Sequence, residues 1–374
     1  MMHNFKNIKF LNNLKNKNKD TAIIKVDHVI SNAQSYPLVK SLNSVAEFYS
    51  LIDFKNYFST QKPKYKAIFI QLMWDFNKDD YLHVVKLVRE SSPLTKIIFL
   101  DFYAPLHIPN PWILDTVDLY IKKQVLSDID QYTSLYDTNL VEYESAWDSN
   151  FIDPSKLITI DIEKLNDKLF VGWNFATDPI RIKQFFKSER QLKSANKTID
   201  IHCRMTAPSD RKTWYTSMRG RAFDAIEKLS QNYEDELNIL NENKLIKYND
   251  YISELINSKL CISPFGYGEV CWRDFEAILA GSLLIKPDMS HLVTKPNIYI
   301  PYETYVPINW DYSDLEEKCI YYIENQKERY KITSNARAVW DNFIQEKWII
   351  LLEDLSEKLG LDNIFKSKSP FSKR

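Results

Sequence analysis

The stretch CISPFGYGEVCWRDFEAILAG, residues 261–281, decides how the second half of this chain folds. It holds Gly266, Gly268 and Gly281, which are three of the six glycines in 374 residues. Glycine is used where the backbone takes a positive φ, or where another group comes too close for a Cβ. The stretch predicts a buried strand ending in CISPF, a glycine turn, and a helix that begins near Glu269.

The predicted helix has a charged face. Glu269, Arg273 and Glu276 are spaced i, i+4, i+7, which places them on one side of a helix. Free N–H groups and the positive dipole end at a helix start attract phosphate. An arginine one turn in can meet a diphosphate, and a carboxylate further along can take both hydroxyls of a ribose. The alternative is an exposed face of Glu–Arg pairs, each worth a few tenths of a kcal/mol. The clustered glycines favour the nucleotide-binding interpretation.

Apolar strands alternate with helices along the rest of the chain. We expect strands within residues 21–30, 64–75, 95–105, 116–126, 197–205, 259–265 and 282–288, and helices within 79–92, 219–233 and 335–361. A short strand that leads into a helix is expected within 244–258. Continuously apolar strands separated by helices are typical of a parallel sheet covered on both faces. The sequence therefore predicts an α/β fold of two Rossmann-like domains in tandem, closed by a C-terminal helix. No GxGxxG follows the strands of the first half, which disfavours a dehydrogenase-type dinucleotide site.

The length of the chain also favours two domains. It exceeds the roughly 250–300 residues at which one core usually stops growing. Turn residues and a glycine near residues 150–170 mark the predicted link. We expect a Lys/Asn-rich lead-in at 1–20, a first domain at 21–165, a second domain at 166–340 and a C-terminal helical segment at 341–374.

Composition excludes several classes of protein. A formal net charge of −1 does not suggest a nucleic-acid binder. None of the four cysteines forms a CxxC pair, so we expect no zinc site and free thiols in a reducing cytoplasm. No apolar run reaches the ~18 residues of a membrane span, and residues 1–20 lack a signal-peptide core. Those residues predict either a solvated tail or a weak electrostatic contact with an anionic membrane surface. The chain is thus expected to be cytoplasmic, or peripheral to a membrane.

The segment SPFGYGE…RDFEAILAGSLLIKPD resembles the donor-binding segment of GT-B glycosyltransferases, closest to the exostosin-like and group 1 families. In those families a glycine-rich turn precedes a helix with an R-x-x-E-A pattern, matched here by Arg273, Glu276 and Ala277. The resemblance implies that Glu276 binds the ribose of a nucleotide sugar and that Arg273 neutralises its diphosphate. It is specific over about 30 residues, loose over the second domain, and limited to the fold in the first.

Three further residues of this segment, Ser263, Gly266 and Gly268, are expected to bind the donor. Glu269 departs from the pattern. Retaining group 1 enzymes carry two glutamates with seven residues between them, whereas six separate Glu269 from Glu276. The departure leaves the stereochemical outcome open. Glu269 is kept as a catalytic candidate.

More donor-binding candidates lie outside this segment. Arg204 follows a strand beside His202, where ligands collect in open α/β sheets, and the resemblance implies that it contacts phosphate. The alternative for Arg204 is a salt bridge to an acid of the other domain. Arg221 belongs to a basic cluster at the next helix start, one member of which is expected to face the cleft. The resemblance places Tyr248 at the nucleobase. Lys286 is expected either to touch the sugar or phosphate or to lie in a surface turn.

A general base is required near the acceptor hydroxyl if the transfer is inverting. Asp101, directly after the apolar run IIFL, is our first candidate, and Asp75 is the second. Their alternative role is that of an N-cap or turn residue. No DxD motif stands in a suitable loop, so we expect catalysis without metal or cofactor, with cationic side chains and a helix dipole neutralising charge.

These features predict a glycosyltransferase that moves a sugar from a nucleotide-activated donor to a glycan or lipid-linked acceptor, in polysaccharide biosynthesis or glycoprotein assembly. Two alternatives stay open at this stage. A nucleotide-sugar epimerase of the same fold would close its cleft around the donor alone. A non-catalytic nucleotide-sugar or glycan-binding module would bind the donor without turning it over.

Overall fold

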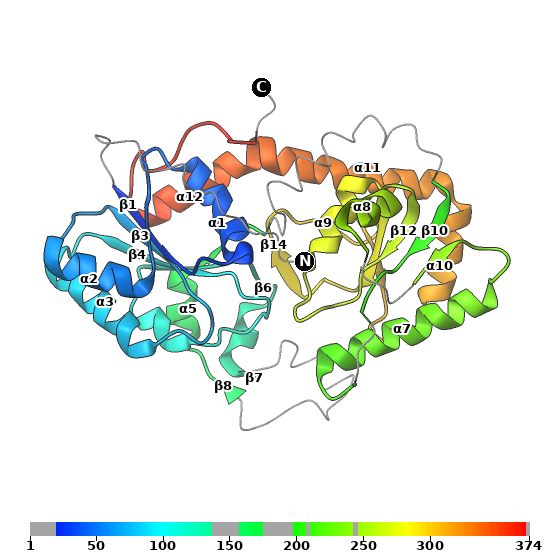
Figure 1. Ribbon diagram of the computed structural model, residues 1–374, viewed down its shortest axis with the longest axis horizontal. Coiled ribbons are helices and arrows are strands. Elements are labelled where there is room, and N and C mark those ends of the chain that lie inside the picture. Colours follow the sequence, from blue (N-terminus) through cyan, green and yellow to red (C-terminus); the bar gives the residue numbers. More distant parts are fainter. Residues whose placement is uncertain (1–19, 137–156, 175–196, 207–209, 242–245, 372–374) are drawn as a thin grey trace.

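The computed structural model describes residues 20–136, 157–174, 197–206, 210–241 and 246–371. Two α/β domains lie side by side, and a long helical run crosses from the second to the first (Figure 1). The predicted pair of Rossmann-like domains with a closing C-terminal helix is confirmed. The predicted lead-in at residues 1–20 lies outside the described residues, except for residue 20.

The first domain is built on a six-stranded parallel sheet of order β2-β1-β3-β4-β5-β9. Its strands are β1 (Thr21–Lys25), β2 (Glu47–Tyr49), β3 (Ala67–Gln71), β4 (Lys96–Asp101), β5 (Leu119–Lys122) and β9 (Leu169–Val171). The central strands β3 and β4 are buried almost throughout, as expected for strands covered on both faces.

Helices α1 (Val29–Ser41), α2 (Leu51–Gln61), α3 (Lys78–Ser91) and α5 (Ile162–Lys168) connect these strands. Two short 3₁₀ helices, η1 (Pro111–Asp115) and η2 (Ile129–Ser134), and a small antiparallel pair, β7 (Leu135–Tyr136) with β8 (Leu157–Ile158), complete the domain. The start of α3 is fixed by Asn77, whose side chain accepts a hydrogen bond of 2.9 Å from the Asp80 amide.

The second domain has a five-stranded parallel sheet of order β11-β10-β12-β13-β15. Its strands are β10 (Ile199–His202), β11 (Ile239–Leu240), β12 (Ser258–Ile262), β13 (Leu283–Pro287) and β15 (Val306–Ile308). Its helices are α7 (Trp214–Asn232), α8 (Tyr248–Ile256), α9 (Trp272–Ala280), α10 (Leu315–Glu324) and α11 (Gln326–Asn342). Gly281 ends α9 with φ 65°, the left-handed conformation that favours glycine at this position.

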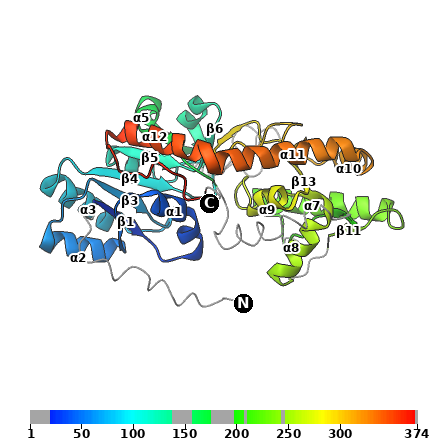
Figure 2. The same ribbon diagram turned by 90° about the horizontal axis from the view of Figure 1, so that it is seen from above.

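The boundary between the domains differs from the predicted one at residue 165. Strand β9 pairs with β5 in the first sheet, so the first domain continues to at least Val171. The chain also returns to the first domain at its end. After α11 the helical run continues through η5 (Phe343–Lys347), a π-helical turn, into α12 (Trp348–Leu359), which lies over the first domain (Figure 2). The Trp348 indole donates to Ser41 Oγ at 2.9 Å.

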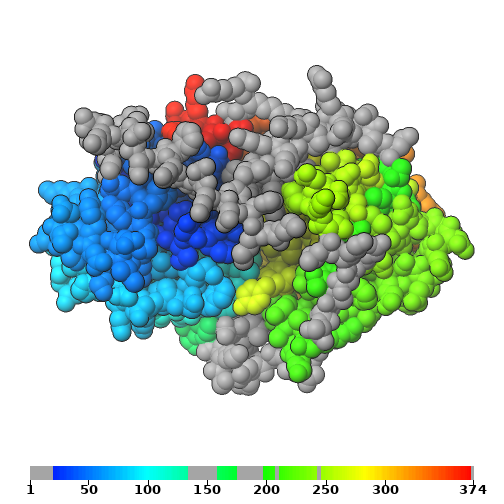
Figure 3. All heavy atoms as spheres, viewed as in Figure 1, coloured from blue at the N-terminus to red at the C-terminus, as the bar shows by residue number. Residues whose placement is uncertain are grey.

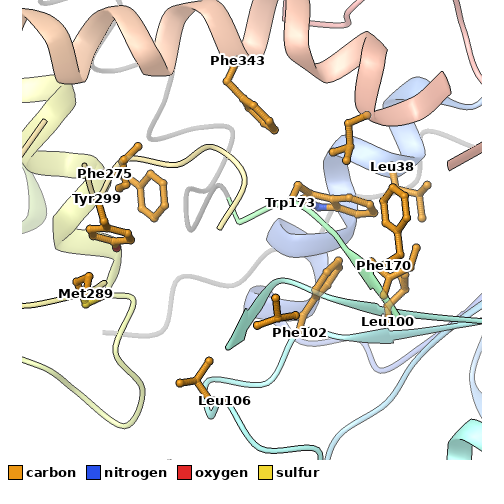
Figure 4. Packing of buried hydrophobic residues seen from close by; sticks show 14 of the residues in the cluster. Leu38, Leu100, Phe102, Leu106, Phe170, Trp173, Phe275, Met289, Tyr299 and Phe343 are labelled. Carbon is orange, nitrogen blue, oxygen red and sulfur yellow. The ribbon is translucent and has the colours of Figure 1, made fainter. Parts of the chain in front are cut away.

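A two-stranded antiparallel sheet joins the two domains. Strand β6 (Gln124–Leu126) of the first domain pairs with β14 (Leu292–Thr294) of the second. The predicted single strand at 116–126 is therefore two strands in different sheets, which divide at Lys123. Figure 4 shows buried side chains on both sides of this junction, Phe102 and Leu106 from the first domain and Met289 and Tyr299 from the second.

Candidate functional site

Helix α9 begins later than the sequence suggests. Its first residue is Trp272 and its N-cap is Cys271, whose amide donates to the Asp274 carboxylate at 2.9 Å. Asp274 at this position closes a capping box and fixes the helix start. Glu269 therefore lies in the loop before the helix, and the predicted three-residue helix face is wrong. Arg273 and Glu276 alone share a face of α9.

Arg273 is a cation without a carboxylate partner among the described residues. Its Nη2 donates to the backbone carbonyl of Arg204 at 2.5 Å. Its Nε is buried and has no hydrogen-bond partner in the part of the chain that the structure describes. An unsatisfied buried donor is costly, and one on a charged group more so. The guanidinium is thus positioned to bind an anion.

Glu276 is held by two tyrosines of α8. The Tyr248 hydroxyl lies 3.3 Å from Oε1, and the Tyr251 hydroxyl donates to Oε2 at 2.9 Å. The two rings lie nearly parallel, with centroids 6.1 Å apart. Tyr248 is expected at a nucleobase. Its hydroxyl contacts the Glu276 carboxylate, which is expected at the ribose, so both residues belong to one cluster.

Arg204 is neutralised by an acid of its own domain. Its Nε and Nη2 donate to the two Glu254 oxygens at 2.5 and 2.8 Å, a bidentate pair. The predicted alternative, a salt bridge to an acid of the other domain, is wrong, because Glu254 lies on α8 of the same domain. Burial, followed by the charges of Arg273 and Arg204, lowers the pKa of His202 to about 3, so this histidine is neutral. The side chain of Arg204 supports the cluster, and its carbonyl orients Arg273.

The glycines of the turn have two different roles. A Cβ on Gly268 would lie 2.3 Å from the backbone oxygen of Ala104, in the first domain. A Cβ on Gly266 would meet nothing closer than the Cys271 sulfur at 3.7 Å. The approach of the other domain therefore requires glycine at 268, whereas Gly266 leaves space open. The expected contact of Gly268 with the donor stays a prediction.

Replacing Gly268 with alanine is expected to lower the melting temperature, because the Ala104 backbone must move away from the new Cβ. Overpacking of this kind costs about 1–3 kcal/mol. The matched variant Gly266→Ala should melt at the wild-type temperature, since its Cβ makes only an ordinary contact. Thermal unfolding of both variants checks the assignment, and equal losses would contradict it.

Glu269 is fully buried at the domain junction. Its Oε2 accepts a 3.3 Å hydrogen bond from Gln124 of β6, and Oε1 has no partner among the described residues. Burial raises the pKa of this carboxyl to about 8, although Lys122, Lys286 and Lys123 act in the opposite direction. Gln124 also donates to the Ala104 carbonyl and accepts from Asn174, so it links three segments at this point.

Ser263 and Lys286 lie in the core of the second domain. Both are 0% exposed, and both contact Asp274, at 2.5 Å from the Ser263 hydroxyl and 3.3 Å from the Lys286 ammonium. The Tyr299 hydroxyl donates to the same carboxylate at 2.6 Å. This packing corrects the prediction that Ser263 and Lys286 touch the donor: they hold Asp274, and Asp274 fixes the start of α9.

Asp101 is buried in an ion pair. Its carboxylate accepts from the Lys122 ammonium and the Tyr120 hydroxyl, each at 2.8 Å, and all three side chains are fully buried. Lys122 also donates to the carbonyls of Pro105 and His107. A carboxylate neutralised in this way cannot reach an acceptor hydroxyl. The geometry corrects the choice of Asp101 as general base and gives it a structural role.

Asp75 lies in an exposed turn that follows β3. Beside it Trp74 is 63% exposed. Val26 and Val29, which follow the neighbouring strand β1, are also exposed. Of the two acids proposed as a base, Asp75 is thus the one that a substrate can reach.

Arg221 lies on α7, on the side of Asp311. The pKa of Asp311 is lowered first by hydrogen bonds from Ser313 and then by the charge of Arg221. The expected role of Arg221 in donor binding stays a prediction.

Two residues near the site, Tyr251 and Lys123, are not predicted from the sequence. Tyr251 lies one helical turn from Tyr248, and this i, i+3 spacing was its only sequence signal. Lys123 is 8% exposed at the carboxyl end of β5, and its ammonium has no ion pair or hydrogen bond with a described residue. Two consecutive lysines at the end of a strand predict an exposed basic end, whereas Lys123 is buried.

No group of three or more potential metal ligands occurs in the described part of the chain. Within the same residues, no helix is both long and apolar enough to cross a membrane.

Figure 3 shows one face of the molecule, on which the yellow surface of the second domain meets the cyan surface of the first.

Comparisons with known proteins establish the fold. No family model and no curated protein matches the sequence. Among solved structures, an α-glucosyltransferase in complex with UDP-glucose and DNA containing an abasic site is 11% identical, with a TM-score of 0.50, over 90% of this chain and 98% of that one. A glycosyltransferase from Rickettsia africae ESF-5 is 13% identical, with a TM-score of 0.46, over 91% and 98%. A protein described as a UDP-N-acetylglucosamine 2-epimerase from Listeria monocytogenes is 12% identical, with a TM-score of 0.45, over 92% and 98%. The chain has the GT-B fold.

Proposed function

We propose that this chain is a glycosyltransferase that moves a sugar from a nucleotide-activated donor to a glycan or lipid-linked acceptor, without metal or cofactor. The observation that carries the proposal is Arg273, a cation on α9 with a buried, unbonded Nε and no carboxylate partner in the described residues. Glu276 lies one turn further along the same helix, with its carboxylate fixed by two tyrosines. A cation and an oriented carboxylate on one helix face suit the diphosphate and ribose of a nucleotide.

The roles of the residues follow from their charges. Arg273 would neutralise the diphosphate as the sugar leaves, with the positive dipole end of α9 acting in the same sense. Glu276 would accept hydrogen bonds from the ribose hydroxyls. Gly266 would allow the donor to approach the backbone.

The acceptor is proposed to bind at the carboxyl edge of the first sheet. Trp74 and the exposed apolar residues Val26 and Val29 offer a surface for sugar rings or a lipid, and Asp75 lies beside them as the proposed base. The formal net charge of −1 favours a glycan or lipid-linked acceptor over nucleic acid. A cytoplasmic location, with weak membrane contact through the basic residues 1–20, fits such an acceptor.

The test is a screen of UDP, GDP, CMP and dTDP sugars, with nucleotide release measured in the presence and absence of glycan acceptors. We expect one nucleotide to stabilise the protein and its release to require an acceptor. Asp75→Asn should keep donor binding and lose about 10²–10⁴-fold in turnover. Epimerisation of the free donor would instead support a nucleotide-sugar epimerase. Donor binding without any turnover would support a non-catalytic binding module.

A further inference from the structure

Two buried polar atoms at the carboxyl edge of the first sheet have no hydrogen-bond partner among the described residues. They are Oγ of Ser31, in the first turn of α1, and Oε1 of Gln71, the last residue of β3. Both residues are more than nine-tenths buried. A buried polar atom without a partner costs free energy, so each of the two calls for a group that completes its bonding.

Gln34 of α1 connects the two residues. Its Oε1 accepts a hydrogen bond of 3.0 Å from Gln71 Nε2. Ser31 lies three residues before Gln34, and residues at this spacing are neighbours on one face of a helix. Ser31 therefore lies on the face of α1 that contacts Gln71.

The side-chain amide of Gln71 is fixed in orientation. Gln34 Nε2 donates to the Phe102 carbonyl at 2.9 Å, so the oxygen of the Gln34 amide is the atom turned toward Gln71. Gln71 must then present its NH₂ group to Gln34, which leaves the Gln71 oxygen without a donor. The Trp173 indole donates to the backbone carbonyl of Gln34 at 2.8 Å and anchors this turn of the helix. Gln71 Oε1 is thus an acceptor held in place for a donor that a ligand must supply.

Both residues lie where open α/β sheets bind ligands. In the order β2-β1-β3-β4-β5-β9, the chain runs from β1 outward to β2 and then returns to β3 on the other side of β1. Ligands bind at such a reversal, outside the carboxyl ends of the strands. Gln71 ends β3, and Ser31 lies in the helix that follows β1. Helix α1 is also on the side of the first domain that faces the second domain (Figure 1).

The surroundings indicate a neutral ligand that carries hydroxyl groups. Neither unbonded atom is charged, and the ammonium of Lys25, which pairs with Gln71 in the sheet, donates to the Asn32 side chain. The start of α1 also exposes the apolar side chain of Val29. A sugar ring has both kinds of surface, since its hydroxyls suit Ser31 Oγ and Gln71 Oε1 and its C–H groups suit an apolar side chain.

We propose that Ser31 and Gln71 bind hydroxyl groups of the acceptor sugar and thereby determine which acceptor is used. Gln34 is a positioning residue, because it acts through Gln71. This inference rests on the proposed function. It identifies the part of the acceptor that the first domain recognises as a sugar ring and not a lipid chain. Asp75, the proposed base, follows Gln71 by four residues.

The experiment measures nucleotide release from the nucleotide sugar that stabilises wild type, with the methyl glycosides of glucose, galactose, mannose and N-acetylglucosamine as acceptors. The glycoside that gives the fastest release is then compared with its monodeoxy analogues, each of which lacks one hydroxyl. For wild type we expect at least one analogue to have a KM about 10- to 100-fold higher, the range for leaving one buried polar atom unpaired.

The variants Gln71→Met and Ser31→Ala should lose this discrimination. In each variant the KM of the parent glycoside should rise about 10- to 100-fold, to the value of one deoxy analogue, because the partner of the missing hydroxyl is gone. The affinity for the nucleotide alone should equal that of wild type in both variants. A residue that only supports the fold would not remove the difference between a glycoside and its deoxy analogue.

Ser31→Ala also separates binding from folding. Ser31 Oγ has no hydrogen bond to lose, so this variant should melt at or above the wild-type temperature. Ser35→Ala is the matched control, because Ser35 is a buried serine one turn further along α1 whose hydroxyl donates to the Ser31 carbonyl at 2.8 Å. It should keep the wild-type KM and the wild-type discrimination among the deoxy glycosides.

Each contrary result has a separate meaning. If Gln71→Met and Ser31→Ala discriminate among the deoxy glycosides as wild type does, the two residues do not bind the acceptor, and this inference is refuted while the proposed function stands. A Ser31→Ala variant that melts below wild type with an unchanged acceptor KM would refute the role of Ser31 in the same way. If wild type releases nucleotide with none of the glycosides, the proposed function fails and this inference fails with it.

Discussion

Replacing Arg273 with methionine is expected to abolish stabilisation by nucleotide, while the protein itself stays folded. The guanidinium has no carboxylate partner among the described residues, so its loss leaves no acid of the site unpaired. Losing a charge-assisted contact to phosphate should weaken binding about 100-fold. Titration of the nucleotide that stabilises wild type most strongly measures this effect.

Arg337→Met is the matched control for this variant. Arg337 lies on α11 and pairs with Asp341 four residues along the same helix, at 3.1 Å. It should bind nucleotide with wild-type affinity. Wild-type affinity in the Arg273 variant would refute the phosphate role of Arg273 and remove the main support for a donor site on α9.

Replacing Lys122 with methionine is expected to destabilise the protein strongly, by about 3–5 kcal/mol. The change leaves Asp101 as an uncompensated charge in a fully buried position, with hydrogen bonds from the Tyr120 hydroxyl and the Tyr103 amide but no cation beside it. It also frees the carbonyls of Pro105 and His107, on the loop that carries Ala104 to the junction. Chemical denaturation measures the loss.

The double variant Asp101→Leu with Lys122→Met tests whether the two residues stabilise the protein as a pair or independently of one another. Removing both charges should recover part of the stability, because a buried pair can often be replaced by apolar residues with little loss. Additive losses would contradict the pairing.

The sequence was sufficient for the fold and for the central helix of the site. The continuously apolar strands β3 and β4 predict a covered parallel sheet, and the glycine at 281 predicts the end of α9. The start of α9 was not predictable from the usual signal, because its N-cap is Cys271 rather than one of the residues that favour this position. The sequence therefore predicts Glu269 within the helix, whereas the structure places Glu269 in the loop before α9.

The remaining errors concern burial and contacts between distant segments. A charged residue at the end of a strand can face a ligand or a buried partner, and the sequence around Asp101 and Lys286 does not distinguish the two. Residue 268 must be glycine because the backbone of Ala104, in the other domain, leaves no space for a Cβ. The burial of Lys123 results from the way the two domains meet, so the local sequence does not predict it.

The most direct test of the central claim is a crystal structure of the protein with the nucleoside diphosphate that stabilises it. We predict that the ribose lies at Glu276 and that a phosphate lies within hydrogen-bonding distance of Arg273 Nε. A nucleotide bound elsewhere, with Arg273 Nε still lacking a partner, would contradict it.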